Sequence, residues 1–180
     1  MNEFILYFKI GLNHVLDFAA YDHVLFLIVL AVIFSFNQFR KVVWLVTLFT
    51  IGHSTTLALS AYGILSIRMA LIEFLIPLTI CITGIVNVFD AKKSTSRKEN
   101  TNLIFGLLFG CIHGLGFSNY FKMMIGKEED KLFPLLEFAL GIEAAQIIIV
   151  FGVLILGNIL QYFFSVTKRD WIMVCSSIVF

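Results

Sequence analysis

The sequence predicts an all-α integral membrane protein, a polytopic transmembrane helical bundle of about six spans with a short interfacial helix at its N-terminus. Hydrophobic residues make up 59% of the 180 residues and charged residues only 14%, and the mean hydropathy is +0.95. These values lie far from the balance of soluble domains. Apolar runs near or above the roughly 20 residues that cross a bilayer also recur along the chain. We therefore expect residues 1–180 to form a single transmembrane domain surrounded by lipid.

The apolar runs define the expected helices in order. Residues 4–20 place apolar side chains on one helical face and His14 and Asp17 on the other, which is typical of a helix lying along the membrane surface. A sixth apolar run opens at Trp171 and stops at Phe180. Such a run is too short to cross about 30 Å of hydrocarbon, so we expect a truncated sixth span. Five full spans are expected before it, near residues 22–38, 41–63, 69–89, 102–120 and 132–160.

The positive charges predict the orientation of the chain. Of the 13 Lys and Arg residues, eight fall in loops on one side of the predicted bundle and five on the other. By the positive-inside rule the richer side is cytoplasmic, so the N-terminus is expected on the outer, periplasmic side of the inner membrane. The dispersed charges and a net charge of +1 exclude the basic stripe of a nucleic-acid-binding protein. The eight residues are Arg40, Lys41, Lys92, Lys93, Arg97, Lys98, Lys168 and Arg169.

Ionisable side chains inside the predicted spans are the strongest indication of function, because each costs about 2.5–3.5 kcal/mol to insert into a membrane. Asp22 and His23 open the first span, and Glu73 lies near the same outer end of the third. Three more lie 11 or 12 residues into their own spans, near or beyond the middle of the bilayer at about 1.5 Å per residue. These three are His53, His113 and Glu143.

This set of residues is what a metal site needs. Imidazole binds Ni, Cu, Fe and Zn well, and carboxylates complete the coordination sphere. Glu143 has no basic residue in its own span, so it must be neutral, paired with another helix or bound to a cation. The expected metal ligands are Asp22, His23, His53, His113 and Glu143, with His14, Asp17 and Glu73 as further candidates.

Each of these residues also has a simpler interpretation. A single histidine inside a membrane can hydrogen-bond to a neighbouring helix and hold it in place. Asp22 and His23 would also serve as caps in contact with water at the start of a helix. His14 and Asp17, three residues apart on a surface helix, fit a solvated pair better than two ligands. These simpler interpretations explain the residues one at a time, but they account less well than a metal site for so many ionisable residues in the predicted spans.

Small residues flank two of the histidines. Gly52 precedes His53, and His113 lies among Gly110, Gly114 and Gly116. Small residues allow membrane helices to approach closely, so we expect close helix contacts at both histidines. A second hypothesis is a helix broken at residues 114–116, since irregular backbone at membrane depth is tolerated where it lines a cavity or is buried in protein.

Four segments allow a comparison with a known family. They are YDHVLFL at 21–27, FTIGHSTTL at 49–57, FGCIHGLGF at 109–117 and GIEAAQ at 141–146. In order and spacing, over nearly the whole chain, they resemble the HupE/UreJ membrane proteins, which are regarded as nickel or cobalt permeases accessory to hydrogenase and urease. The resemblance implies that Asp22 and His23 form the Asp-His signature of that family. In the family another histidine usually precedes this pair, with five residues between it and the aspartate. Here Leu16 occupies that position, and seven residues separate His14 from Asp22.

These observations leave three functions open. In the first, a divalent metal, nickel or cobalt by resemblance, enters from the outer face and is transported through the His/Asp/Glu site. The second is a zinc-type intramembrane hydrolase or transferase, with an open metal position that activates water and Glu143 as general base. Its substrate would be a lipid or a membrane-embedded chain. The third is a non-catalytic membrane partner or assembly subunit. Few polar groups lie between the predicted site and the predicted cytoplasmic side, so the sequence indicates a binding pocket more clearly than a route for ions across the membrane.

Overall fold

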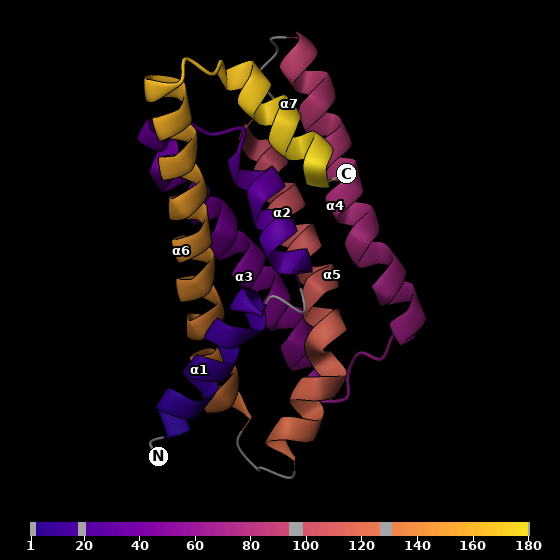
Figure 1. The fold of residues 1–180 in the computed structure, drawn as a ribbon. Helices are drawn as coiled ribbons and strands as arrows, with labels where there is room; N and C mark the ends of the chain where they lie inside the picture. Colours follow the sequence, from indigo (N-terminus) through magenta and orange to yellow (C-terminus); the bar gives the residue numbers. More distant parts are fainter. Residues whose placement is uncertain (1–2, 18–20, 94–98, 127–130, 180) are drawn as a thin grey trace.

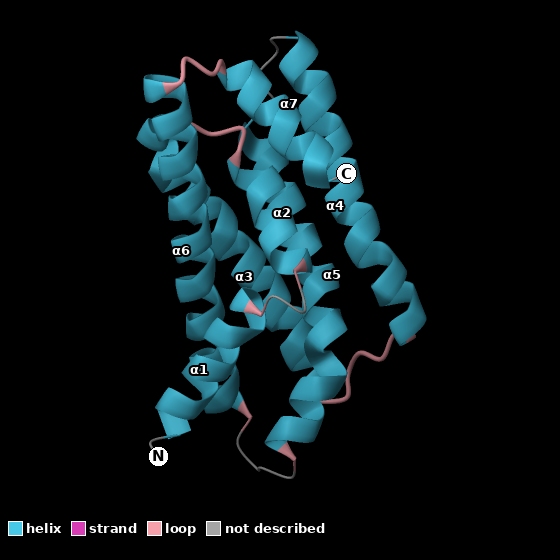
Figure 2. Cartoon of the chain, in the orientation of Figure 1, coloured by secondary structure: helices cyan, strands magenta, loops and turns pink. Residues whose placement is uncertain are grey.

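Every regular element of the described residues is a helix, as Figures 1 and 2 show. This computed structural model describes residues 3–17, 21–93, 99–126 and 131–179. The prediction of an all-α protein is therefore confirmed for this part of the chain. In order, the elements are α1 (Glu3–Leu16), α2 (Asp22–Ala31), the 3-10 turn η1 (Phe36–Gln38), α3 (Phe39–Ala61), α4 (Met69–Lys93), α5 (Glu99–Ile125), α6 (Leu132–Phe163) and α7 (Lys168–Val179).

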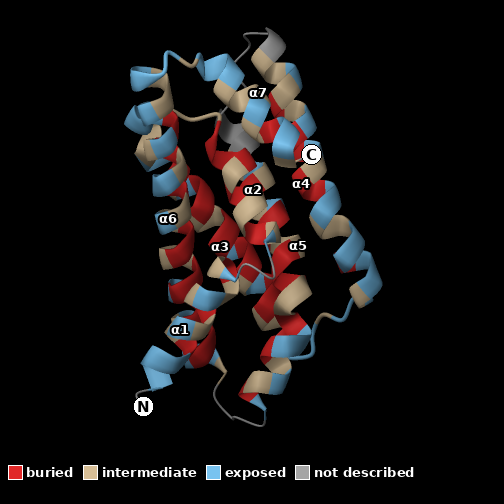
Figure 3. Ribbon diagram, in the orientation of Figure 1, coloured by how far each residue is buried: buried red, intermediate tan, exposed pale blue. Residues whose placement is uncertain are grey.

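Four segments of these helices are long and apolar enough to cross a membrane. The shortest have 23 residues, which at about 1.5 Å per residue exceeds the roughly 30 Å hydrocarbon thickness. Half of the most apolar part of α3 is buried, against 28% for α4, so α3 is a central helix and α4 a peripheral one (Figure 3). The four segments match four of the predicted spans and are Phe36–Ala61, Met69–Ala91, Leu103–Ile125 and Leu132–Phe163.

The first predicted span is wrong, because residues 22–38 do not form one helix. α2 ends at Ala31 after ten residues, and the chain turns through η1 before α3 begins. In Figure 1, α1 occupies the lower part of the bundle and α2 begins near its middle and continues upward. The two short helices therefore follow one another like the halves of a discontinuous transmembrane helix.

The N-terminal helix also differs from the predicted interfacial helix, because one side of α1 is packed into the bundle along α6. Tyr7 and Val15 are buried. A side chain on Gly11 would collide with the Phe138 carbonyl, and one on Gly141 would collide with the Phe8 carbonyl. Two glycines facing each other's backbones let the helices touch, and this contact draws α1 into the protein.

The closest pair of long helices is α3 and α5. Gly106, Gly110 and Gly114 lie four residues apart on one face of α5, and side chains there would strike Leu45, Phe49 and His53 of α3. From the other side, Gly52 faces the Leu107 carbonyl. The predicted close contact is therefore present. The predicted break at residues 114–116 is not, because α5 is continuous from Glu99 to Ile125 and its glycines serve helix packing.

The last helix, α7, has only 12 residues, about 18 Å of helix, and lies across one end of the bundle against α4 (Figure 1). Gly157 of α6 packs against the Trp171 ring. The Lys168 ammonium donates a hydrogen bond to the Ser35 hydroxyl at 3.0 Å, and partial burial lowers the pKa of Lys168. The count of six spans is thus not confirmed, since four helices of the described residues have sufficient length.

Replacing Gly110 with alanine should destabilise the protein, because its Cβ would meet the α3 backbone, which cannot rotate away. We expect the free energy of unfolding to fall by about 1–3 kcal/mol, as for other overpacked interiors. Thermal unfolding of the purified protein in detergent measures the effect. Gly152→Ala is the matched control, since nothing lies within 4 Å of its would-be Cβ, and an equal loss in both variants would contradict the packing argument.

Candidate metal site

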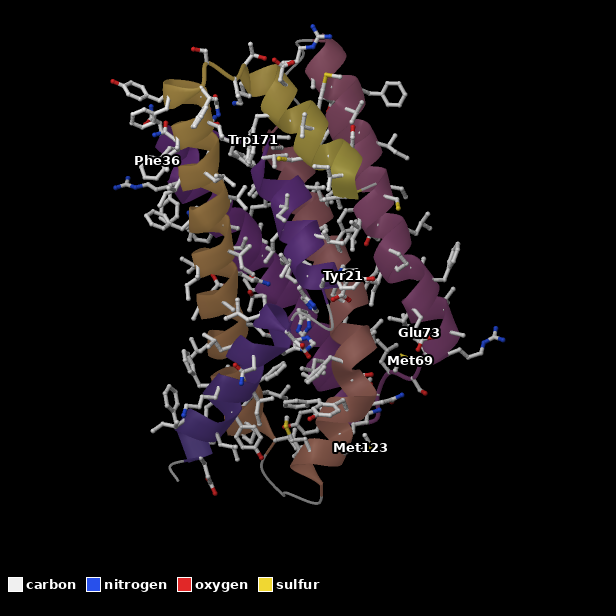
Figure 4. All side chains as sticks on the ribbon, viewed as in Figure 1. Tyr21, Phe36, Met69, Glu73, Met123 and Trp171 are labelled. Atoms are coloured by element: carbon white, nitrogen blue, oxygen red, sulfur yellow. The ribbon has the colours of Figure 1, made fainter. Side chains whose placement is uncertain are left out.

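All four histidines of the chain meet inside the bundle, each from a different helix. The last turn of α1 carries His14, and the first turn of α2 carries His23. Ring centroids are 4.6 Å apart for His14 and His23, 5.3 Å for His23 and His113, and 5.9 Å for His14 and His53. Figure 4 shows side-chain nitrogens crowded where α1 ends, beside α2 and α5.

Three of these residues already approach the arrangement of a metal site. His14, His23 and His53 each offer one ligand atom, and these atoms all lie within 4.8 Å of one another. Nitrogens bound to a single ion at about 2.1 Å lie at most about 4.2 Å apart. Small rotations of the rings would therefore complete a three-histidine site, with His113 adjacent to it.

Hydrogen bonds fix which nitrogen of two rings is free to bind a metal. The Nδ1 of His113 donates to the Phe109 carbonyl oxygen at 2.9 Å. The Nδ1 of His23 donates to Asp22 Oδ1 at 3.0 Å. A carbonyl or carboxylate oxygen accepts, so Nδ1 carries the proton and Nε2 keeps its lone pair. A carboxylate behind a histidine is the usual support of a metal-binding imidazole.

Five of the remaining ring nitrogens are buried without partners among the described residues. Among the described residues, the Nε2 atoms of all four histidines and the Nδ1 of His53 have no hydrogen-bond partner. His53 is fully buried and His113 is 1% exposed. Buried polar atoms are nearly always paired, and leaving one unpaired costs about 1–3 kcal/mol. Four converging, unpaired nitrogens fit a bound metal ion, which accepts such lone pairs.

The discontinuity between α1 and α2 also favours a cation here. α1 ends at Leu16, two residues after His14. The last carbonyl groups of a helix lack partners within the helix, and they carry a partial negative charge. The C-terminal end of α1 and the carboxylate of Asp22 therefore both contribute negative electrostatic potential at the histidines, which attracts a cation.

Phenylalanines form the wall of the cluster. Ring centroids are 3.9 Å apart for His14 and Phe117, 5.2 Å for His113 and Phe49, and 5.3 Å for His113 and Phe26. These phenylalanine rings pack against the imidazole rings and shield the imidazole nitrogens from water. A low-dielectric wall strengthens the attraction between the site and an ion.

Comparison with protein families gives one match. The family described as "HupE / UreJ protein" matches residues 1–180. The chain belongs to the HupE/UreJ family. Comparisons with curated proteins and with solved structures found no match. The family is associated with nickel and cobalt transport, and the histidine cluster is compatible with metal handling.

The unusual spacing of His14 in this HupE/UreJ protein has a structural explanation. His14 lies in α1 and Asp22 begins α2, so the spacing between them is not that of one continuous helix. Because the two residues lie on different helices, the repeat of a single helix does not fix their spacing in the sequence, and His14 still reaches the site. The structure thus separates His14 from Asp17, which is exposed and lies outside the group of three histidines.

Asp22, Glu73 and Glu143, the other acidic residues expected at the site, lie in two places. Asp22 supports His23 and also lines a cavity of about 400 Å³ between α2 and α4. Glu73 is exposed and lines the same cavity, on the α4 side of Tyr21 (Figure 4). Glu143 accepts hydrogen bonds from Thr47 and Thr50, and it is not part of the histidine group.

Glu137 of α6 is a further acidic residue that was not among those predicted from the sequence, and it lies outside the group of three histidines. Its Oε2 atom is buried and has no hydrogen-bond partner among the described residues. It precedes Phe138, whose ring lies 5.7 Å from that of His14. An acidic residue inside a predicted span was the signal that selected Glu143, and the same signal would have found Glu137.

Replacing Asp22 with asparagine should weaken Co²⁺ binding about 10- to 100-fold, because an amide supports the His23 imidazole less strongly than a carboxylate. Titration of the purified protein with Co²⁺, followed by absorption spectroscopy or calorimetry, measures the affinity. Asp170→Asn is the control, since Asp170 is exposed on α7 and bonds to Thr167. Unchanged affinity in Asp22→Asn would show that this carboxylate does not support a metal ligand.

Proposed function

We propose that this HupE/UreJ protein binds a divalent transition metal, nickel or cobalt, and carries it across the inner membrane. The observation that supports this proposal is the convergence of four buried, unpaired Nε2 atoms. The metal is the cargo. The ligands would be His14, His23 and His53, with His113 available as a fourth.

The cavity beside Asp22 supplies an access route. It lies between α2 and α4, and its acidic residues are Asp22 and Glu73. Two carboxylates raise the local concentration of cations. Asp22 also accepts a hydrogen bond from the His23 ring, so only the Asp22 side chain would lie between an ion in the cavity and His23.

The proposed direction is from the outer face inward, with the N-terminus outside. Arg40 and Lys168 lie at the end of the bundle where α3 and α7 begin, away from the N-terminus (Figure 1). The positive-inside rule places such an end in the cytoplasm. Residues 94–98 and 127–130, which carry part of the predicted charge difference, lie outside the described residues.

A zinc-dependent intramembrane hydrolase is the second candidate. One observation favours it, since the cavity next to the histidines has a largely apolar lining that includes Leu25, Ile76 and Ile80. Such a cavity would hold an acyl chain. The expected general base, Glu143, is bonded instead to threonines of α3, so this candidate lacks the base assigned to it.

Metal uptake by the purified protein in sealed vesicles tests the transport proposal. We expect uptake of Ni²⁺ or Co²⁺ above that of empty vesicles, and its loss in His53→Ala and His113→Ala, because these variants remove ligands. Asp170→Asn should retain uptake. Uptake no greater than in empty vesicles, in protein with demonstrated metal occupancy, would refute transport. A lipid converted by the wild type and not by His53→Ala would instead support the hydrolase.

The role of the cavity has a separate test in Glu73→Gln. We expect uptake at low metal concentration to slow about two- to tenfold, with the largest effect at low ionic strength, because one attractive charge is removed. Equilibrium Co²⁺ affinity in detergent should stay unchanged, since Glu73 is outside the histidine group. Initial rates over a series of salt concentrations measure the effect, and a rate independent of this substitution would exclude the proposed access route.

A further inference from the structure

A second polar cluster lies in the bundle between α3 and α6. The hydroxyl of Thr47 donates to Glu143 Oε1, and that of Thr50 donates to Glu143 Oε2. Gln146 is fully buried, with Oε1 3.0 Å from the Thr50 hydroxyl. Thr50 precedes His53 by three residues on α3, about 4.5 Å along the axis, so this cluster lies next to the histidines on the side where α3 begins.

The hydrogen bonds of this cluster are incomplete. The Thr50 hydroxyl has one hydrogen and faces three acceptors, namely Glu143 Oε2, Gln146 Oε1 and the Val46 carbonyl. The Nε2 of Gln146 is buried and has no partner among the described residues. Rotating the amide by 180° lets Gln146 donate to Thr50, but its oxygen then occupies the unpaired position. Either orientation leaves one buried polar atom without a partner, which points to a missing ligand.

The chemistry of the cluster defines that ligand. With the amide rotated, the atom without a partner is the Gln146 oxygen, and its neighbours are the Glu143 carboxylate and the hydroxyl oxygens of Thr47 and Thr50, which donate their hydrogens to Glu143 and keep free lone pairs. Such a set favours hard cations, whereas nickel and cobalt bind imidazole well. Glu143 makes no ion pair with a basic residue among the described residues. A single carboxylate balances one positive charge, so a monovalent cation leaves this partly buried site neutral and a divalent one does not.

We propose that Thr47, Thr50, Glu143 and Gln146 form a second cation site that binds Na⁺, separate from the transition-metal site. Binding of Na⁺ would orient the face of α3 that also carries His53. Binding of Na⁺ would then change the affinity of the protein for the transition metal. Because coupling between two sites is reciprocal, binding of the transition metal would change the affinity for Na⁺ by the same factor. This coupling rests on the proposed function, whereas the Na⁺ site itself does not.

Thermal unfolding of the purified protein in NaCl and in choline chloride of equal ionic strength tests the site. We expect Na⁺ to raise the melting temperature saturably in the wild type. Glu143→Gln and Thr47→Val should each weaken the apparent Na⁺ affinity at least about tenfold, as loss of ligands or their supports does elsewhere. Thr55→Val is the matched control on the same helix, because Thr55 is exposed and bonds only to the Ile51 carbonyl among the described residues.

Co²⁺ titration of the same variants separates the two sites. Glu143→Gln and Thr47→Val should stay monodisperse and bind Co²⁺ at the histidines. If Glu143→Gln fails to fold, Thr47→Val decides the question. The proposal is overturned if Na⁺ and choline stabilise the wild type equally, or if Thr55→Val loses the Na⁺ effect as well. It is also overturned if Glu143→Gln abolishes Co²⁺ binding as His53→Ala does, since Glu143 would then belong to the transition-metal site.

Vesicles with an imposed Na⁺ gradient test the coupling. We expect the gradient to change the initial rate of Co²⁺ uptake in the wild type and in Thr55→Val, but not in Glu143→Gln. An uptake rate independent of Na⁺ would refute the coupling. Absence of any uptake together with intact Na⁺ binding would refute the proposed transport and leave the Na⁺ site supported.

Discussion

A polar group inside a lipid bilayer finds no water, so the protein itself must satisfy it, and this constraint organises the whole bundle. The backbone meets it with helices, which are the only regular elements of the described residues. α1 ends at Leu16 and α2 begins at Asp22, so two of the histidines lie close to helix ends, His14 in the last turn of α1 and His23 in the first turn of α2. Tyr21 and Asp22, at the start of α2, line the cavity between α2 and α4.

The side chains follow the same constraint by gathering into clusters. Histidines from four helices share one site, and the threonines, Glu143 and Gln146 share a second. The two differ in chemistry. The first presents imidazole nitrogens within a wall of aromatic rings, and the second presents oxygens. A transition metal and a hard cation would therefore select different sites on the same helix, α3.

Glycines determine how closely these clusters can form. The α3 and α5 backbones touch through Gly52, Gly110 and Gly114, so His53 and His113 project from helices whose separation is fixed. Gly11 and Gly141 do the same for α1 and α6, which brings His14 inward. Without these contacts α1 would lie at the membrane surface, as its apolar face alone suggests, and His14 would meet water. The packing of one helix therefore changes the chemical role of one residue.

The sequence by itself determined the membrane environment, the four long spans and the histidines worth considering, because apolar length and the cost of buried charge are local properties. It also indicated the close contact at Gly52 and Gly110. Only the tertiary structure decided that α1 and α2 are two short helices and that His14 joins His23. It likewise placed Glu143 with Thr47 and Thr50 rather than with the histidines. These outcomes depend on which helix faces meet, and residues far apart in the sequence make those contacts, so no local pattern specifies them.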